Sequence, residues 1–197
     1  MAKLESSLKN MFLSLTFITL GASALLAGGY AITKEPIERA DKAKKENAIK
    51  AVLPDKGAVI RDAVEVTLEG KKNKFIVYPA EKNGKLIGAA VQTYSTEGYG
   101  GQIEVMVGLN EKGSIVNYSV LSAAETPGLG SKIVDWFKTE KNNQSIIGRN
   151  PATKDLKLKK DGGSIDAITA STISSRAFLD AIQDAFDAFM NYRENHK

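Results

Sequence analysis

Apolar and charged residues divide the chain into an uncharged N-terminal segment, a highly charged stretch, a region of short apolar runs and an amphipathic C-terminal segment. Residues 11–33 contain no charged side chain. At about 1.5 Å per helical residue, this segment is long enough to cross the roughly 30 Å hydrocarbon core of a membrane. We therefore predict a transmembrane helix. Its small residues, which suit close packing against other membrane helices, are Gly21, Ala22, Ser23, Ala27, Gly28 and Gly29.

A cleaved signal peptide is the alternative interpretation of this segment. Lys3 and Lys9 would form its basic end, and Ala22-Ser-Ala24 has the small residues of a processing site. The apolar run continues well beyond that site, which favours an uncleaved anchor. Its length argues against a helix buried in the core of a soluble protein.

The charged stretch that follows has the features of a solvated helix. Pro36 suits the first turn of a new helix, and Leu53-Pro54 would end it. We interpret residues 34–54 as a stalk helix that leads to a folded domain. Its weak apolar face is formed by Ile37, Ala40, Ala48, Ile49 and Val52.

Short apolar runs then predict an antiparallel meander. Asn83-Gly84 is a strong signal for a tight hairpin turn between two of these runs. Glycines at Gly98-Tyr-Gly-Gly101 would let the chain bend sharply or let another backbone approach closely. The predicted strands are Lys74–Tyr78, Lys85–Tyr94, Gln102–Leu109 and Ser114–Leu121.

The chain after the meander alternates between turns and short elements. Glu125-Thr-Pro-Gly-Leu-Gly130 fits a type II turn, because proline and glycine occupy its two central positions. We predict helical structure at Ser131–Lys138 and an edge strand at Leu156–Lys159, before a turn at Asp161-Gly-Gly163.

The C-terminal segment gives the clearest helical pattern, with apolar residues at three- and four-residue spacing that we assign to the core. Together these patterns predict an α+β fold, with one N-terminal transmembrane helix and a single domain built on a mostly antiparallel sheet. The apolar residues of the final helix are Ala177, Phe178, Ala181, Ile182, Ala185, Phe186, Phe189 and Met190.

A hydroxyl-rich stretch, Asp166-Ala-Ile-Thr-Ala-Ser-Thr-Ile-Ser-Ser175, lies immediately before that helix. Ser171 or Thr172 is a natural N-cap, because a hydroxyl oxygen accepts hydrogen bonds from free N–H groups of the first turn. The same N–H groups and the helix dipole favour a bound phosphate. A capped helix without any ligand is the simpler alternative.

Composition limits the chemistry that the side chains alone can provide. The chain has no cysteine, and its single histidine, His196, lies next to the C-terminus. Thiolate chemistry and Cys-ligated iron–sulfur clusters are thereby excluded, and a histidine-rich metal site or a Ser-His-Asp triad has almost nothing to be built from. A net charge of +4 over 197 residues gives no indication of nucleic-acid binding. Any redox chemistry would require an organic cofactor.

Three separated patches resemble one known family. Asp166-x-x-Thr169-Ala170-Ser171-Thr172-x-Ser174 is similar to the flavinylation motif Asp-x-x-Ser/Thr-Gly/Ala-Ala-Thr-x-Ser/Thr, with Ser171 in place of the usual alanine. Gly98–Gly101 and Glu125–Gly130 precede it in the order found in the FMN-binding domain family. That family includes the G subunit of the Rnf-type ion-translocating electron-transport complex, which this chain resembles most, and the C subunit of the sodium-translocating NADH:quinone reductase.

The resemblance implies FMN joined by a phosphoester to Thr172 through a separate flavin transferase. It also implies a redox subunit that relays electrons among other membrane subunits of a complex, without completing a reaction alone. We expect no catalytic residue and no metal site. The remaining residues that the resemblance places at the cofactor are Glu125, Thr126, Gly128, Leu129, Gly130, Thr169, Ser171 and Ser174.

The resemblance further implies a bacterial inner-membrane protein with residues 1–10 in the cytoplasm, a single span at 11–33 and an extracytoplasmic domain at 55–197. Counting only lysine and arginine, the basic residues of the stalk favour the opposite orientation, so the expected orientation rests mainly on the resemblance. The alternatives are a cofactor-free membrane-tethered scaffold and a flavin-dependent reductase or regulatory domain.

Overall fold

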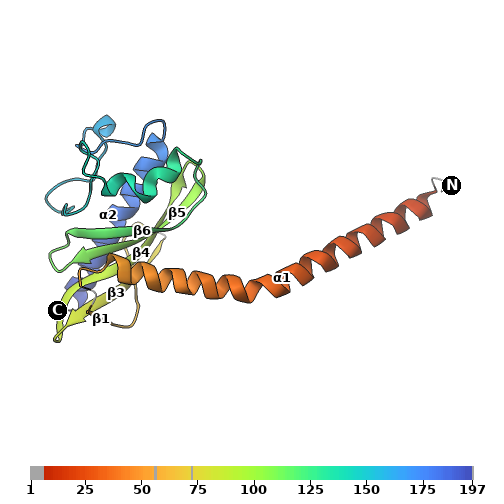
Figure 1. Cartoon of the computed structure of the whole chain (residues 1–197), viewed down its shortest axis with the longest axis horizontal. Helices are drawn as coiled ribbons and strands as arrows, with labels where there is room; N and C mark the ends of the chain where they lie inside the picture. Colours follow the sequence, from red (N-terminus) through yellow and green to blue (C-terminus); the bar gives the residue numbers. More distant parts are fainter. Residues whose placement is uncertain (1–6, 56, 72, 197) are drawn as a thin grey trace. The chain divides into compact units, whose positions relative to one another are not determined.

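The computed structural model describes residues 7–55, 57–71 and 73–196, so Lys3 of the possible signal peptide lies outside the described residues. The chain divides into two compact units, Met1–Ala43 and Lys44–Lys197. Helices and strands carry the labels of Figure 1.

One continuous helix, α1 (Leu8–Val52), contains the whole uncharged segment, and its most apolar stretch is not buried against the rest of the chain. It is long and apolar enough to cross a membrane. Pro36 lies inside α1, so the prediction that a separate helix begins there was wrong. Proline removes only one helical hydrogen bond. Ion pairs on either side of it, Lys34–Glu38 at 4.0 Å and Arg39–Glu35 at 2.6 Å, span the same turn.

The second unit is built on an antiparallel sheet whose strand order is β1-β3-β4-β5-β6, with β2 also paired to β3 (Figure 1). This arrangement confirms the predicted α+β fold and its antiparallel meander. The strands are β1 (Val59–Ile60), β2 (Val64–Thr67), β3 (Lys74–Lys82), β4 (Lys85–Gly98), β5 (Gly101–Asn110) and β6 (Ile115–Ala123).

Short turns connect the strands of the meander at the positions that the sequence predicts. Asn83 and Gly84 join β3 to β4 with φ angles of 53° and 73°, the two positive values that a type I′ hairpin turn requires. Gly98 and Gly101 pair directly across the next turn, so Tyr99 and Gly100 form a two-residue connection between β4 and β5.

One predicted element was wrong in type. Leu156–Lys159 is not a strand: Leu158 makes one isolated bridge with Ile165, and the chain then enters the 3₁₀ turn η3 (Lys159–Asp161). Buried leucines alternate with lysines in this segment, as they would in a strand. The turn at Asp161-Gly-Gly163 reverses the chain before a ladder of strand hydrogen bonds can form. The helical structure predicted at Ser131–Lys138 is present as two 3₁₀ turns, η1 (Gly130–Val134) and η2 (Trp136–Lys138).

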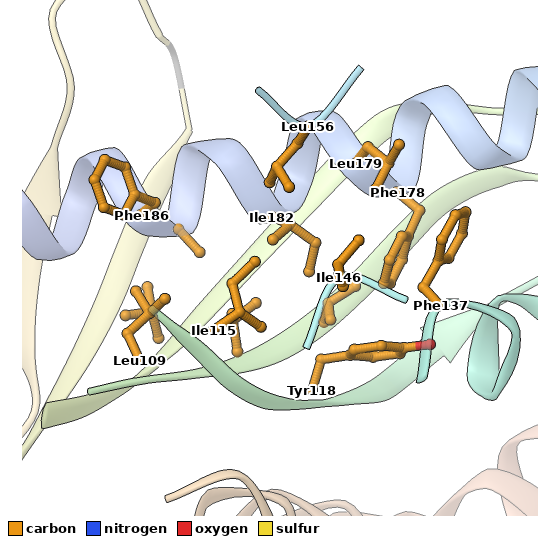
Figure 2. Close-up of a cluster of buried hydrophobic side chains, with 14 of the residues drawn as sticks. Leu109, Ile115, Tyr118, Phe137, Ile146, Leu156, Phe178, Leu179, Ile182 and Phe186 are labelled. Atoms are coloured by element: carbon orange, nitrogen blue, oxygen red, sulfur yellow. The ribbon is translucent and has the colours of Figure 1, made fainter. Parts of the chain in front are cut away.

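The long helix α2 (Thr172–Asn195) covers one face of the sheet, and its apolar stripe forms the core as predicted. Figure 2 shows Phe178 of α2 between two other aromatic rings. Phe178 stacks on Phe137 with ring centroids 4.9 Å apart and meets Tyr118 edge-on at 4.8 Å. The Tyr118 hydroxyl donates to the Ile133 carbonyl at 2.8 Å, and burial raises the pKa of Tyr118 above its ordinary value.

The C-terminal end of α1 packs on the opposite face of the sheet. Its residues Ala48, Ile49 and Val52 contact a second buried cluster that includes Ala90 and Met106. Gly108 on β5 permits this approach: a methyl group added there would lie 1.8 Å from the Val52 carbonyl oxygen. The sheet is therefore enclosed by α2 on one face and by the end of α1 on part of the other.

We predict that Gly108→Ala destabilises the folded unit by about 1–3 kcal/mol, because the added methyl forces the end of α1 away from the sheet. Urea unfolding of the purified protein measures this change. Gly57→Ala is the matched control, since its methyl would meet only the tip of the Asp55 carboxylate, at 3.3 Å. Equal stability of the two variants would contradict the close packing.

Candidate functional site

A pocket of about 530 Å³ lies where the three sequence patches meet. The turn between β4 and β5 provides one wall, the loop after β6 the second, and the start of α2 the third. The patches are thus brought together from distant parts of the chain. The lining residues are Tyr99, Glu125, Thr126, Leu129, Ala170, Ser171, Thr172, Ile173 and Ser174.

The Glu125 carboxylate is the group that connects these three walls. It is only 8% exposed. One oxygen, Oε2, accepts a hydrogen bond from the Ser174 hydroxyl at 2.7 Å, and Oε1 accepts one from the Gly100 N–H at 3.2 Å. A buried carboxylate needs such donors to offset its loss of hydration. Glu125 therefore fixes the first turn of α2 against the β4–β5 turn.

Two glycines allow the backbone to approach this carboxylate. A methyl group at Gly130 would lie 2.3 Å from Glu125 Oε2, and one at Gly100 would lie 2.0 Å from the Ala124 carbonyl oxygen. Any side chain at either position would displace the segments that hold Glu125. Close approach therefore explains Gly100 and Gly130, whereas Gly101 and Gly128 adopt positive φ angles of 102° and 76°.

The loop after β6 forms the predicted type II turn. The Leu129 N–H donates to the Thr126 carbonyl at 3.1 Å, and Gly128 has a φ of 76°. The Ser131 hydroxyl accepts from the Gly128 N–H at 2.9 Å. The turn leaves the Leu129 side chain 39% exposed at the pocket.

The start of α2 presents free backbone donors to the pocket. Thr172 is the first helical residue and Ser171 occupies the N-cap position, but the Ser171 side chain caps no N–H group. Within the described residues, the N–H groups of Thr172, Ile173 and Ser174 have no hydrogen-bond acceptor. These unpaired donors and the helix dipole create a favourable place for an anion.

A tight turn of Ile168–Ser171 sets the position of this helix start. The Ser171 N–H donates to the Ile168 carbonyl at 3.0 Å, and Ala170 adopts a φ of 61°, in the left-handed region. The buried Ser175 hydroxyl accepts from the Ile168 N–H at 3.0 Å and donates to the Ser171 carbonyl at 2.8 Å. Sequence reasoning did not assign Ser175 to the site, although its two bonds hold the Ile168–Ser171 turn closed.

Asp166, the first residue of the motif, supports a neighbouring loop. Its carboxylate accepts from the Asn143 N–H at 3.1 Å and pairs with Lys159 at 2.7 Å, and its carbonyl accepts from Trp136 Nε1 at 3.0 Å. The Lys159 ammonium, followed by the Asn143 N–H, holds the pKa of Asp166 below its ordinary value. Asp166 therefore holds the loop at Asn143 and the 3₁₀ turns close to the motif.

A lysine contacts the start of α2. Lys160 Nζ donates to Thr172 Oγ1 at 3.3 Å. Lys132, close to the loop after β6 in sequence, is exposed and is absent from the pocket lining. Lys160 had no recognisable signal in the sequence, because it lies between the predicted strand at Leu156–Lys159 and the predicted turn at Asp161-Gly-Gly163.

The pocket brings together Glu125, Thr126, Leu129, Ser171, Thr172 and Ser174, six of the residues that the resemblance placed at the cofactor. Gly128 and Gly130 shape the loop beside it without lining it. Thr169 is exposed and does not line the pocket. Tyr99 and Ile173, 70% and 51% exposed, are lining residues that the sequence did not indicate.

This donor set fits a ligand with an anionic end and a flat apolar body. Free N–H groups and the Thr172 hydroxyl, to which Lys160 donates, lie at the start of α2, and the exposed side chains of Tyr99, Leu129 and Ile173 offer apolar surface. FMN has both features, a phosphate and an isoalloxazine ring. Among the described residues there is no group of three or more acidic or histidine side chains that could hold a metal ion.

Comparison with known proteins gives concordant results. The family model of the FMN-binding domain matches residues 98–187, a range that contains all three patches. The chain is 30% identical to the G subunit of the ion-translocating oxidoreductase complex of Aliivibrio fischeri, covering 96% of this chain and 93% of that protein. It is 29% identical to the protein of the same name from Shewanella piezotolerans, with coverage of 96% and 92%, and 32% identical to that from Haemophilus influenzae, with coverage of 84% and 82%.

We predict an energetic coupling between Glu125 and Ser174 of about 1.5–3 kcal/mol, the range typical of a hydrogen bond to a charged group. A double-mutant cycle of Glu125→Ala and Ser174→Ala, followed by urea unfolding, measures it, because alanine at either position removes one partner and adds no new hydrogen-bonding group. Ser174→Ala alone should be destabilising, because it leaves a buried carboxylate oxygen without its donor. Additive effects of the two changes would show that the bond contributes nothing.

Proposed function

Because this chain belongs to the family of G subunits of ion-translocating oxidoreductase complexes, we propose that it is a membrane-anchored flavoprotein that relays electrons within such a complex. The observation that carries the proposal is the pocket at the start of α2, where Thr172, free N–H groups and an apolar wall meet. The complex would couple electron transfer to ion translocation. Its other membrane subunits would be the electron donor and acceptor.

The cofactor is proposed to be FMN, attached through its phosphate to Thr172. A phosphoester does not form readily from free FMN in water, so the donor is a phosphoanhydride of FMN. Thr172 Oγ1 forms the new bond to phosphorus, the anhydride P–O bond breaks, and the leaving phosphate group takes the electron pair. The hydroxyl proton passes to a base of the flavin transferase or to water. No electrons are exchanged in this step.

Each wall of the pocket would contact a different part of the bound FMN. The N–H groups of Thr172, Ile173 and Ser174 would bind the phosphate oxygens. The flat ring would pack against Leu129 and Tyr99. The hydrogen bond between Glu125 and Ser174 holds the start of α2 in place. It would not bind the phosphate itself. When bound, FMN supplies the redox chemistry, which a chain without cysteine and with a single histidine cannot provide.

The pocket favours an electron carrier over a complete substrate reductase. Among the described residues, Glu125 is the only titratable carboxylate or amine that lines it, and both of its oxygens accept hydrogen bonds from the protein. A general acid–base pair for a substrate is absent from these lining residues. A role as one redox centre among several subunits is consistent with this arrangement.

The proposed topology follows from the same function. Residues 11–33 would form a single span in the bacterial inner membrane, with residues 1–10 in the cytoplasm. Residues 34–54 would continue outside the membrane, and residues 55–197 would form the extracytoplasmic domain. Free FMN is a cytoplasmic metabolite, so a covalent link would keep the cofactor in a domain on the other side.

Thr172→Ala is expected to abolish flavin attachment, because it removes the only nucleophilic oxygen at the motif position. Intact mass and visible absorbance of protein made in the presence of the transferase measure attachment, and peptide mapping locates it. Thr172→Ser should keep partial labelling, since it retains a hydroxyl but lacks the methyl group that restricts rotation.

The matched control is Thr153→Ala, which removes an exposed threonine hydroxyl outside the pocket and should leave labelling unchanged. The Thr172→Ala protein should stay folded, since the Thr172 side chain caps no helical N–H. Flavin retained in Thr172→Ala, or mapped to another residue, would end the proposal. Colourless wild-type protein in the presence of an active transferase would favour a cofactor-free scaffold.

Reporter fusions at the C-terminus test the topology. A reporter that is active only outside the cytoplasm should be active when fused after residue 197, and a reporter that folds only in the cytoplasm should be silent. The opposite pair of results would refute the proposed orientation. Protein sequencing that begins near Leu25 would instead identify a cleaved signal peptide.

A further inference from the structure

Three basic side chains surround the start of α2, and two of them are neutralised by carboxylates. Lys159 pairs with Asp166 at 2.7 Å. Arg176 makes two bonds to Asp161, at 2.8 and 2.9 Å, which hold the pKa of Asp161 below its ordinary value. Lys160 forms no ion pair among the described residues, although its charge, after that of Arg176, also helps to lower the pKa of Asp161. It is therefore the one cation of the three that no carboxylate holds in an ion pair.

The fold directs this free charge at the oxygen proposed to carry the flavin. Lys160 Nζ lies 3.3 Å from Thr172 Oγ1. Lys160 is the central residue of η3 (Lys159–Asp161), and each of its two neighbours in that turn is tied by an ion pair, Lys159 to Asp166 and Asp161 to Arg176 of α2. Ion pairs therefore hold the residues on both sides of Lys160, and one of these ion pairs is made with α2 itself.

We propose that Lys160 is the phosphate-binding residue of the attachment site, selecting a flavin phosphoanhydride and then neutralising the product. This inference rests on the proposed function of Thr172. As Thr172 Oγ1 bonds to phosphorus and the anhydride bond breaks, the Lys160 ammonium donates to the phosphate oxygens and keeps its proton throughout. The resulting phosphodiester has one negative charge, which the single positive charge of Lys160 balances.

The surrounding charges support this assignment. Once the two ion pairs are formed, Lys160 and the partial positive charge of the helix N-terminus are the sources of positive potential at Thr172. The Lys160 side chain is exposed, and among the described residues its one hydrogen bond is to Thr172. Its removal should therefore affect phosphate binding far more than folding.

The experiment measures initial rates of flavin attachment to the full-length apoprotein by the transferase, with the flavin phosphoanhydride as the varied substrate. Lys160→Gln keeps a polar side chain without charge and should lower kcat/KM by roughly five- to tenfold. Lys160→Arg keeps the charge and should restore at least half of the wild-type rate. Lys157→Ala is the matched control for loss of an exposed lysine on the neighbouring segment, and its rate should be unchanged.

Ionic strength gives a second readout that a purely structural role would not change. Attachment to the wild type should slow as salt increases, whereas the rate with Lys160→Gln should depend less on salt, because the screened charge is missing. A wild-type rate and salt dependence in Lys160→Gln would overturn the inference, as would equal losses in Lys160→Gln and Lys160→Arg. Failure of the proposed function is distinguishable, since it would appear as labelling of Thr172→Ala or as no labelling of the wild type.

Discussion

The buried carboxylate of Glu125 is the constraint on which the arrangement of the site depends. A charge removed from water must find donors, and here the donors come from two segments far apart in the chain, the β4–β5 turn and the first turn of α2. The close approach of Gly100 and Gly130 is a consequence of meeting that requirement. Because Glu125 itself begins the loop after β6, one side chain links three walls of the pocket.

The same arrangement separates charge within the pocket. The negative group is buried in the wall and satisfied by protein donors, whereas the positive groups, the helix N-terminus and Lys160, remain available. Apolar side chains complete the lining. A ligand with an anionic end and a flat ring would be oriented by its anionic end, and its ring would lie beside the exposed side chain of Tyr99. Such an orientation would suit the redox cofactor proposed above.

Local signals in the sequence predicted the elements that local physics determines. The Asn83-Gly84 turn, the type II turn at Gly128 and the stripe of α2 each require specific residues at specific spacings, and each was correct. The edge strand at Leu156–Lys159 was wrong, because a strand exists only where a partner strand continues beside it. Pro36 was misleading because the sequence does not show whether the turns on either side will continue as one helix.

At the site, the sequence indicated the motif residues but not the direction of their hydroxyl groups. Ser171, the expected cap, makes no side-chain hydrogen bond within the described residues, which explains how it can replace the usual alanine of the motif. Ser174 and Ser175, adjacent on α2, instead bond to different segments. Hydroxyl directions depend on tertiary neighbours, and so did the identification of Lys160 and Tyr99.

The left-handed conformation of Ala170 has a consequence for the variability of the motif. An alanine at a φ of 61° is strained by about 1–2 kcal/mol, and glycine would relieve that strain. Glycine would also give the unfolded chain more conformational freedom, which costs the folded state about 0.4–1 kcal/mol. The strain is at least as large as the entropy effect, so glycine would fit this position as well as alanine or better. A β-branched side chain would be strained still more, so the turn before Thr172 favours residues that tolerate a left-handed backbone conformation.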